Sequence, residues 1–118
     1  MTVTVGSEID LLSGLCLGHN VPHDTLARWL SDVDGYIALH VWRQGELCRE
    51  YSYSDSPDTP LLLQEPPHRR IYFLYLRAMV DFASGQYSAY ANGIGAYNRA
   101  MADYVHSYLC TRDRGEEN

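Results

Sequence analysis

The segment from Tyr87 to Tyr108 carries a large side chain at every third or fourth position without a break. Steps of three and four residues place such side chains on one face of an α-helix, along the seam that packs against a partner helix. We therefore predict one long amphipathic helix here, about 33 Å long at roughly 1.5 Å per residue. The members of this stripe are Tyr87, Tyr90, Ile94, Tyr97, Met101, Tyr104 and Tyr108.

Tyrosine dominates this stripe, and the chain as a whole has ten Tyr against two Phe. A tyrosine ring is apolar with a polar end, and it is enriched where proteins contact each other. Beside the stripe runs a second row of small residues, which would let another backbone come close: Ala89, Gly93, Ala96 and Ala100. Two interpretations therefore stay open, a stripe buried in the core of the subunit and a stripe that serves an oligomer interface.

Two other stretches show helical spacing of apolar residues, Leu26–Val41 and Pro67–Ser84. A shorter helix is predicted from Ser7, a capping hydroxyl with acids in the turn behind it. Gly85 is a typical helix-ending residue, and it stands directly before the long tyrosine helix, Gln86–Leu109. The last two helices are therefore predicted to form an antiparallel hairpin, with the Leu26–Val41 helix packed across it.

The segment Arg43–Gln64 is rich in Ser, Asp and Pro, which disfavour a helix. We predict an extended loop or a short β-hairpin arm between the second and third helices, and we expect Arg49–Pro60 to be mobile in the isolated subunit because it has few apolar residues. Leu61–Leu63 should fold back over the core, and the charged segment Thr111–Asn118 should be disordered. The predicted fold is one all-α domain, residues 1–118, a small helical bundle with a long C-terminal antiparallel hairpin.

Charge and composition argue against several classes of function. The net charge of −6 disfavours nucleic-acid binding, which needs clustered Lys and Arg to neutralise phosphates, and a basic helix on a membrane surface. The longest apolar run, Ile71–Leu76, is too short to span a bilayer, and Met1–Asp10 lacks the basic and apolar regions of a signal peptide. The widely spaced Cys16, Cys48 and Cys110 indicate reduced thiols rather than a disulfide framework.

The segment Asp32–Ile37 resembles the middle of a calcium-binding loop, with alternate acids followed by a glycine. The first and last ligand positions would be Leu30 and Val41, which cannot coordinate calcium. We therefore interpret Asp32 and Asp34 as acids on a solvated helix face.

Cys16, His19 and His23 have the spacing of metal ligands, with His40 as a conceivable fourth. Structural zinc sites instead contain paired cysteines, or a cysteine pair with a histidine pair. We expect a buried thiol and histidines beside a turn rather than a metal site.

Signatures of catalysis are missing from the sequence. It has no Gly-x-Ser-x-Gly elbow and no phosphate-binding glycine loop. His68 and His106 could act as bases, but nothing in the sequence indicates a substrate. We predict no catalytic, cofactor-binding or metal-ligating residue.

A further pattern combines apolar, aromatic and Asn/Gly positions along most of the chain. It consists of Arg28-Trp29-Leu30, Val33-Asp34-Gly35, Ile37, Leu62-Leu63, Ile71-Tyr72, Tyr75-Leu76, Ala78, Asp81-Phe82, Gly85-Gln86, Tyr90, Asn92, Tyr97-Asn98, Ala100 and Tyr104. This pattern, within Thr25–Tyr108, resembles a group of small proteins that phages and prophages of Gram-positive bacteria encode beside their capsid genes. The group is associated with the head–tail connector, or adaptor, proteins of long-tailed phages.

The resemblance implies a mostly helical structural subunit without substrate, cofactor or metal. Such a subunit assembles as a homo-oligomeric ring, dodecameric when complete, on the phage portal protein after DNA packaging, and it receives the next neck or tail component. DNA passes through the ring without sequence-specific binding, and no membrane is involved. The protein would then be located in the virion, and in the host cytoplasm before assembly.

Tyrosines on the extended segment and at the two ends of the stripe are our candidate interface residues: Tyr51, Tyr53, Tyr87 and Tyr108. Two other interpretations stay open. One is a small helical protein–protein interaction module unrelated to virions. The other is a small enzyme with a site that the sequence does not reveal, which would need a pocket with converging polar groups.

Overall fold

The structure is a computed structural model that describes residues 2–16 and 19–116, with side chains up to Thr111. The described residues form helices, turns and loops, and they contain no β-strand, only an isolated bridge between Thr4 and Pro60. The prediction of an all-α fold is therefore confirmed. The α-helices are α1 (Val5–Leu15), α2 (His23–Tyr36), α3 (Arg70–Ala83) and α4 (Tyr87–Glu116).

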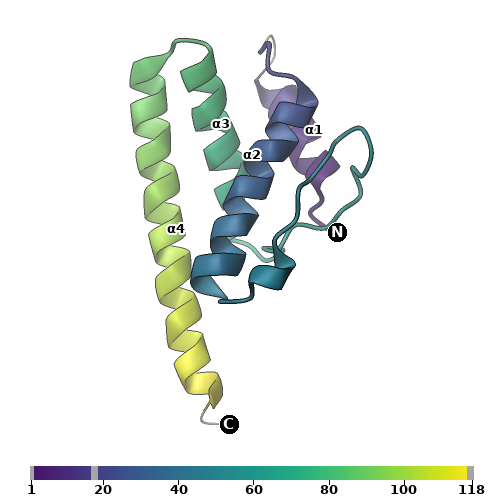
Figure 1. The fold of residues 1–118 in the computed structure, drawn as a ribbon. Coiled ribbons are helices and arrows are strands. Elements are labelled where there is room, and N and C mark those ends of the chain that lie inside the picture. Colours follow the sequence, from purple (N-terminus) through teal and green to yellow (C-terminus); the bar gives the residue numbers. More distant parts are fainter. Residues whose placement is uncertain (1, 17–18, 117–118) are drawn as a thin grey trace.

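The four helices pack so that α3 occupies the middle of the bundle. It contacts α4 on one side and both α1 and α2 on the other. α4 runs alongside α3 in the opposite direction, and α1 lies at the far edge from α4 (Figure 1). The molecule measures 50 × 33 × 24 Å along its principal axes. α1 and α4 therefore present their outer faces at opposite edges of the bundle.

A glycine turn joins α3 to α4. Gly85 has a φ of 77°, in the left-handed region that favours glycine. Its N–H donates to the carbonyl of Phe82 at 3.1 Å, and the N–H of Gln86 donates to the carbonyl of Asp81 at 2.8 Å. This pair of bonds is the Schellman motif that ends a helix. Gly85 thus ends α3 as predicted, and it leaves room for a tight turn into α4.

Helix starts differ from the predicted ones by a few residues. α1 begins at Val5 rather than Ser7, because Thr4 is the capping residue: its hydroxyl accepts from the Ser7 N–H at 3.0 Å, and the Ser7 hydroxyl pairs with the Thr4 N–H at 2.8 Å. α3 begins at Arg70 rather than Pro67, after a series of turns. α2 is followed without interruption by a π-helical turn, Ile37–Val41.

The core contains buried residues from every helix, and Tyr72 is its largest fully buried side chain. Leu61 and Leu63 are buried, so this part of the loop covers the core as predicted. The tyrosine stripe of α4 is buried unevenly: Met101 and Tyr104 are buried, whereas Tyr87 is 64 % exposed. Ile94 is only half-buried, so a stripe buried in the core of the subunit, one of our two interpretations, is wrong for the first turns of α4.

α4 continues to Glu116, into the segment Thr111–Asn118 for which we predicted disorder. Glu117 and Asn118 lie outside the described residues. In the part of the chain that the structure describes, no helix combines the length and apolarity needed to cross a lipid bilayer.

Candidate functional site

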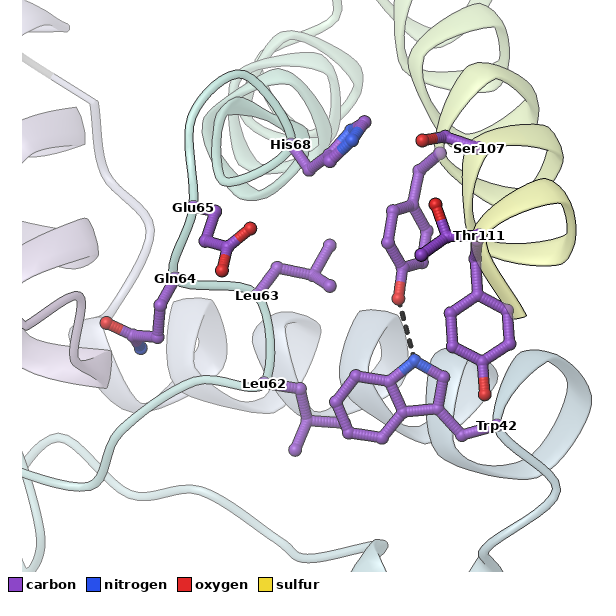
Figure 2. Close-up of a pocket in the computed structure, with 10 residues that line it drawn as sticks. Trp42, Leu62, Leu63, Gln64, Glu65, His68, Ser107 and Thr111 are labelled. Carbon is purple, nitrogen blue, oxygen red and sulfur yellow. Dashed lines mark hydrogen bonds between the residues drawn. The ribbon is translucent and has the colours of Figure 1, made fainter. Parts of the chain in front are cut away.

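One hollow on the described surface lies where the π-helical turn after α2, the loop before α3 and the C-terminal half of α4 meet (Figure 2). Its volume is about 340 Å³. Its floor is buried and its rim is open to solvent, so a bound group could enter without any change in the fold. The lining residues are Trp42, Leu62, Leu63, Gln64, Glu65, His68, Tyr104, Ser107, Tyr108 and Thr111. We call this hollow the aromatic pocket.

The π-helical turn after α2 places Trp42 in this pocket. The Trp42 backbone N–H donates to the carbonyl of Ile37 at 2.8 Å, five residues back rather than four. A π turn holds one more residue than an α turn, so it changes the direction in which the next side chain leaves the helix. The Trp42 indole N–H then donates to the Tyr104 hydroxyl oxygen of α4 at 2.7 Å (Figure 2).

A buried carboxylate fixes the opposite wall. Asp34 of α2 is only 3 % exposed, and it accepts the hydroxyls of Tyr51 and Tyr72, each at 2.6 Å. It also accepts the backbone N–H of Leu62 at 3.0 Å. The Tyr72 hydroxyl in turn accepts the N–H of Leu63 at 2.7 Å. The leucines that line the pocket are therefore positioned by two side chains of the core.

The protonation states of Asp34, Tyr51 and Tyr72 fit a structural role for this network. Burial raises the pKa of Asp34 above its ordinary value, although the donors from Tyr51, Tyr72 and Leu62 act in the opposite direction. Burial and the neighbouring Asp34 charge raise the pKa values of both tyrosines far above 10. Both phenols therefore stay protonated and donate. Buried polar groups that are fully paired in this way stabilise one arrangement of the core.

Asp34 was predicted to be a solvated acid, and that prediction is wrong. The residue lies four positions after Leu30 and three before Ile37, so it is on the apolar face of the helix, where it is buried. Asp32, in contrast, is exposed as predicted. This spacing could have predicted from the sequence that Asp34 is buried. It could not have predicted the hydrogen bonds of Asp34, because the tyrosine donors lie far along the chain.

The four candidate interface tyrosines lie in different places. Tyr51 is 8 % exposed and bonded to Asp34, so its side chain belongs to the core rather than to the surface of the subunit. Tyr53 is half-buried, and its hydroxyl donates to Asp10 of α1 at 2.9 Å. Tyr87 is exposed at the start of α4, and Tyr108 lines the aromatic pocket. For these last three, a contact with another subunit stays a prediction.

The segment Arg49–Pro60, which we predicted to be mobile in the isolated subunit, is bonded to α2 of its own subunit. Asp24, near the start of α2, accepts the backbone N–H groups of Tyr53 at 2.9 Å and Ser54 at 3.1 Å, and the Ser54 hydroxyl at 2.7 Å. Bonds from Ser54 lower the pKa of Asp24. The prediction considered apolar residues only, whereas carboxylates of α1 and α2 also bond to this loop.

His19 and His23, two of the residues with ligand-like spacing, lie near each other beside Ser13. The Ser13 hydroxyl is 3.2 Å from His19 Nε2 and 3.5 Å from His23 Nε2. Among the residues that the structure describes, no three His, Cys, Asp or Glu side chains lie close enough together to hold a metal ion.

The polar side chains of the aromatic pocket have different orientations. The Gln64 amide turns away from the hollow (Figure 2) and bonds to the backbone of Val3, at 2.6 Å to both its N–H and its carbonyl. The Glu65 carboxyl group turns inward, toward the side of Leu63 (Figure 2). The His68 ring meets the Tyr104 ring edge-on, with 5.1 Å between centroids. The sequence alone gave no sign that Trp42 and Glu65 share a pocket, because its walls come from distant segments.

No protein-family model, no curated protein and no solved structure matches this chain.

Proposed function

We propose that this protein is a structural subunit of a phage neck, a head–tail connector that forms a ring on the portal and links it to the next neck or tail component. In this proposal it has no substrate and no cofactor. It is located in the virion, and in the host cytoplasm before assembly. The sequence pattern within Thr25–Tyr108 supports it, and so does one feature of the surface.

The observation that carries the proposal is a pair of unlike apolar surfaces at opposite edges of the bundle. At the α1 edge, Leu15 is 63 % exposed and lies with Leu11 and Phe73 around a shallow hollow. At the α4 edge, Leu109 is 48 % exposed and shares a groove with Tyr36. Exposed apolar patches are typical of protein–protein contacts. We call them the α1 surface and the α4 surface.

Two unlike surfaces on opposite edges suit a head-to-tail contact. Such a contact joins the α1 surface of one subunit to the α4 surface of the next, and it produces a closed ring where the rotation between subunits closes. The long α3–α4 hairpin would then be the repeated element of the ring. If each contact is weak, the ring forms only where a template such as the portal raises the local concentration. Ring symmetry, dodecameric in our proposal, would be copied from the portal.

The acidic charge of the chain fits this role. DNA must pass through a neck channel without sticking, and phosphate-binding proteins use clustered Lys and Arg for the opposite purpose. A net charge of −6 is compatible with such a passage and with no sequence-specific nucleic-acid binding.

The direct test is to delete the gene from the phage or prophage that carries it. The expected result is heads that package DNA, then leak it and carry no tails, as seen by electron microscopy and by nuclease sensitivity of the packaged DNA. Supplying the protein from a plasmid should restore infectious particles. Normal particle yield without the gene, or heads that fail before packaging, would reject the connector role.

A further inference from the structure

The aromatic pocket has the chemistry of a site for an organic cation, and we propose that it binds the guanidinium group of an arginine side chain presented by a partner protein. The inference stands on the pocket alone, and it holds whether or not the chain is a virion subunit. The pocket combines aromatic walls, a carboxylate that points inward, a preformed shape and a suitable size.

The walls supply aromatic faces. Trp42 and Tyr108 are both half-buried, with ring centroids 6.5 Å apart and planes inclined by 24°. Tyr104 is buried beside them, and its centroid lies 6.1 Å from that of Tyr108. A cation within about 6 Å of such rings is attracted by their electron-rich faces, most strongly by Trp. Arginine adds planar stacking, which an ammonium group cannot provide.

The charged and polar lining favours a cation over an anion. Glu65 is the acidic residue of the lining, and its carboxyl group turns into the hollow (Figure 2). A carboxylate pairs with a guanidinium through two parallel hydrogen bonds. The hydroxyls of Ser107 and Thr111 add acceptors on the α4 side. No Lys or Arg is among the described residues that line the pocket, and the imidazole of His68, which is part of the lining, packs edge-on against Tyr104.

The walls are already held in place. The Trp42 indole N–H is fixed by Tyr104 at 2.7 Å, and the backbone of Leu62 is fixed by Asp34 at 3.0 Å. A site that is ordered before binding loses less conformational entropy when it is filled. The pocket therefore does not depend on a partner to form.

Size and shape favour a side chain over a larger free ligand. The volume of about 340 Å³ is near the lower limit of pockets for small molecules, roughly 300–1,000 Å³. The buried Leu63 floor suits the methylene stem of an arginine, and the open rim leaves room for the main chain that carries it. These features assign the site to an arginine of a partner protein.

The test follows the indole N–H signal of Trp42 by NMR while a peptide is added. A Trp29→Phe background removes the other tryptophan, and the probe is the blocked tripeptide acetyl-Gly-Arg-Gly-amide. We expect a saturable shift of the Trp42 signal. The same peptide with citrulline has nearly the same shape but no charge, and it should bind more than about tenfold more weakly.

Variants then test the carboxylate. Glu65→Gln should weaken the arginine peptide by about threefold or more, because it removes the negative charge and keeps the shape. Glu46→Gln is the matched control, since Glu46 is an exposed acid outside the pocket, and it should leave binding unchanged. Both variants change surface residues, so an unchanged amide spectrum should show that both still fold.

Three results would overturn the inference. The first is no shift of the Trp42 signal with the arginine peptide up to its solubility limit. The second is equal binding of the citrulline peptide, or an equal effect of Glu65→Gln and Glu46→Gln. The third concerns the source of the cation: if n-propylguanidinium binds more than about tenfold more tightly than the peptide, the pocket excludes a main chain and the assignment to a partner's side chain is wrong.

Discussion

At the scale of single residues, Asp34 determines how the loop, α2 and α3 fit together. Its carboxylate accepts from three donors, two in the loop and one in α3, and the loss of each would leave different groups without a partner. The Tyr72 hydroxyl both donates to Asp34 and accepts from Leu63, whereas the Tyr51 hydroxyl makes a single bond, its donation to Asp34. The two tyrosine hydroxyls should therefore contribute different amounts to the free energy of unfolding.

We predict that Tyr72→Phe lowers the free energy of unfolding by about 1–3 kcal/mol and that Tyr51→Phe lowers it by less. Tyr72→Phe leaves both a buried carboxylate oxygen and a backbone N–H without their partner. Tyr87→Phe is the matched control, because that ring is largely exposed. Urea denaturation measures the free energy of unfolding of the three variants and of wild type. Equal losses for Tyr72→Phe and Tyr87→Phe would show that the Asp34 network contributes nothing to stability.

Glu8 makes stability depend on pH. It is 7 % exposed on α1, and burial raises its pKa to about 7, with Arg69 acting in the opposite direction. The ordinary pKa of a glutamate is 4.5. Between these values the folded protein holds more protons than the unfolded chain, so the free energy of unfolding falls as pH rises from about 4.5 through 7. This stability is present at low pH and is lost above pH 7.

We predict that Glu8→Gln removes this part of the pH dependence. A glutamine has the shape of the protonated acid and never pays the cost of ionisation. Wild type and variant should have similar stability near pH 4.5, and the variant should be more stable at pH 8, by at most about 3 kcal/mol. Denaturation curves at both pH values measure this difference. A variant that is less stable than wild type at pH 8 would mean that the ionised Glu8 is favourably paired.

At the scale of elements, one glycine lies at a close approach between α3 and α4. A Cβ added at Gly93 would lie 3.3 Å from the Cβ of Ala78 on α3, which is closer than normal packing. A Cβ added at Gly95 would meet only the end of the Arg99 side chain, at 3.6 Å. The two glycines share one helix but face different surroundings, so they form a natural comparison.

We predict that Gly95→Ala raises the free energy of unfolding by about 0.5–1 kcal/mol, the usual gain in helix propensity. Gly93→Ala should give a smaller gain or a loss, because the new methyl group crowds Ala78. Gly93→Leu should clearly destabilise the protein, since the helices would have to separate. The melting temperatures of the three glycine variants are compared with that of wild type. If Gly93→Leu melts with wild type, α4 is not held against α3 at this point.

In the loop after α2, a second element, several hydrogen bonds converge on one side chain, Asp24. Replacing Asp24 with alanine removes the acceptor for the N–H groups of Tyr53 and Ser54. We predict faster hydrogen exchange at these two amides and earlier proteolysis between residues 52 and 60, with little change in the helices. Asp55→Ala, an exposed acid of the same loop, is the control. Equal exchange in both variants would show that Asp24 does not hold the loop.

The elements that sequence predicted correctly are those with local signals. Helical spacing of apolar residues located the helices, and Gly85 located the turn between the last two. The Asp34 network could not be predicted in the same way, because its donors Tyr51 and Tyr72 are 17 and 38 residues away. The aromatic pocket could not be predicted for the same reason, because Trp42 and Tyr104 are 62 residues apart in sequence and meet only in the fold.

At the scale of the whole molecule, the question is whether the α1 and α4 surfaces bind each other. A self-complementary contact would pair like with like and stop at a dimer, whereas a head-to-tail contact continues into a ring or a filament. Charged substitutions at the two exposed leucines, Leu15→Glu and Leu109→Glu, can separate these cases. Neither leucine is buried, so neither change should unfold the subunit.

We predict that each single variant stays monomeric and that a mixture of the two forms dimers and nothing larger. In the mixture, the intact α4 surface of Leu15→Glu can bind the intact α1 surface of Leu109→Glu, and the two altered surfaces then block further growth. Sedimentation velocity measures the species, with and without portal rings as template. Ser88→Glu, an exposed change near the start of α4, is the control and should assemble like wild type. Dimers of Leu109→Glu alone would indicate self-complementary α1 surfaces, and a wild-type protein that stays monomeric even on the portal would contradict ring assembly through these edges.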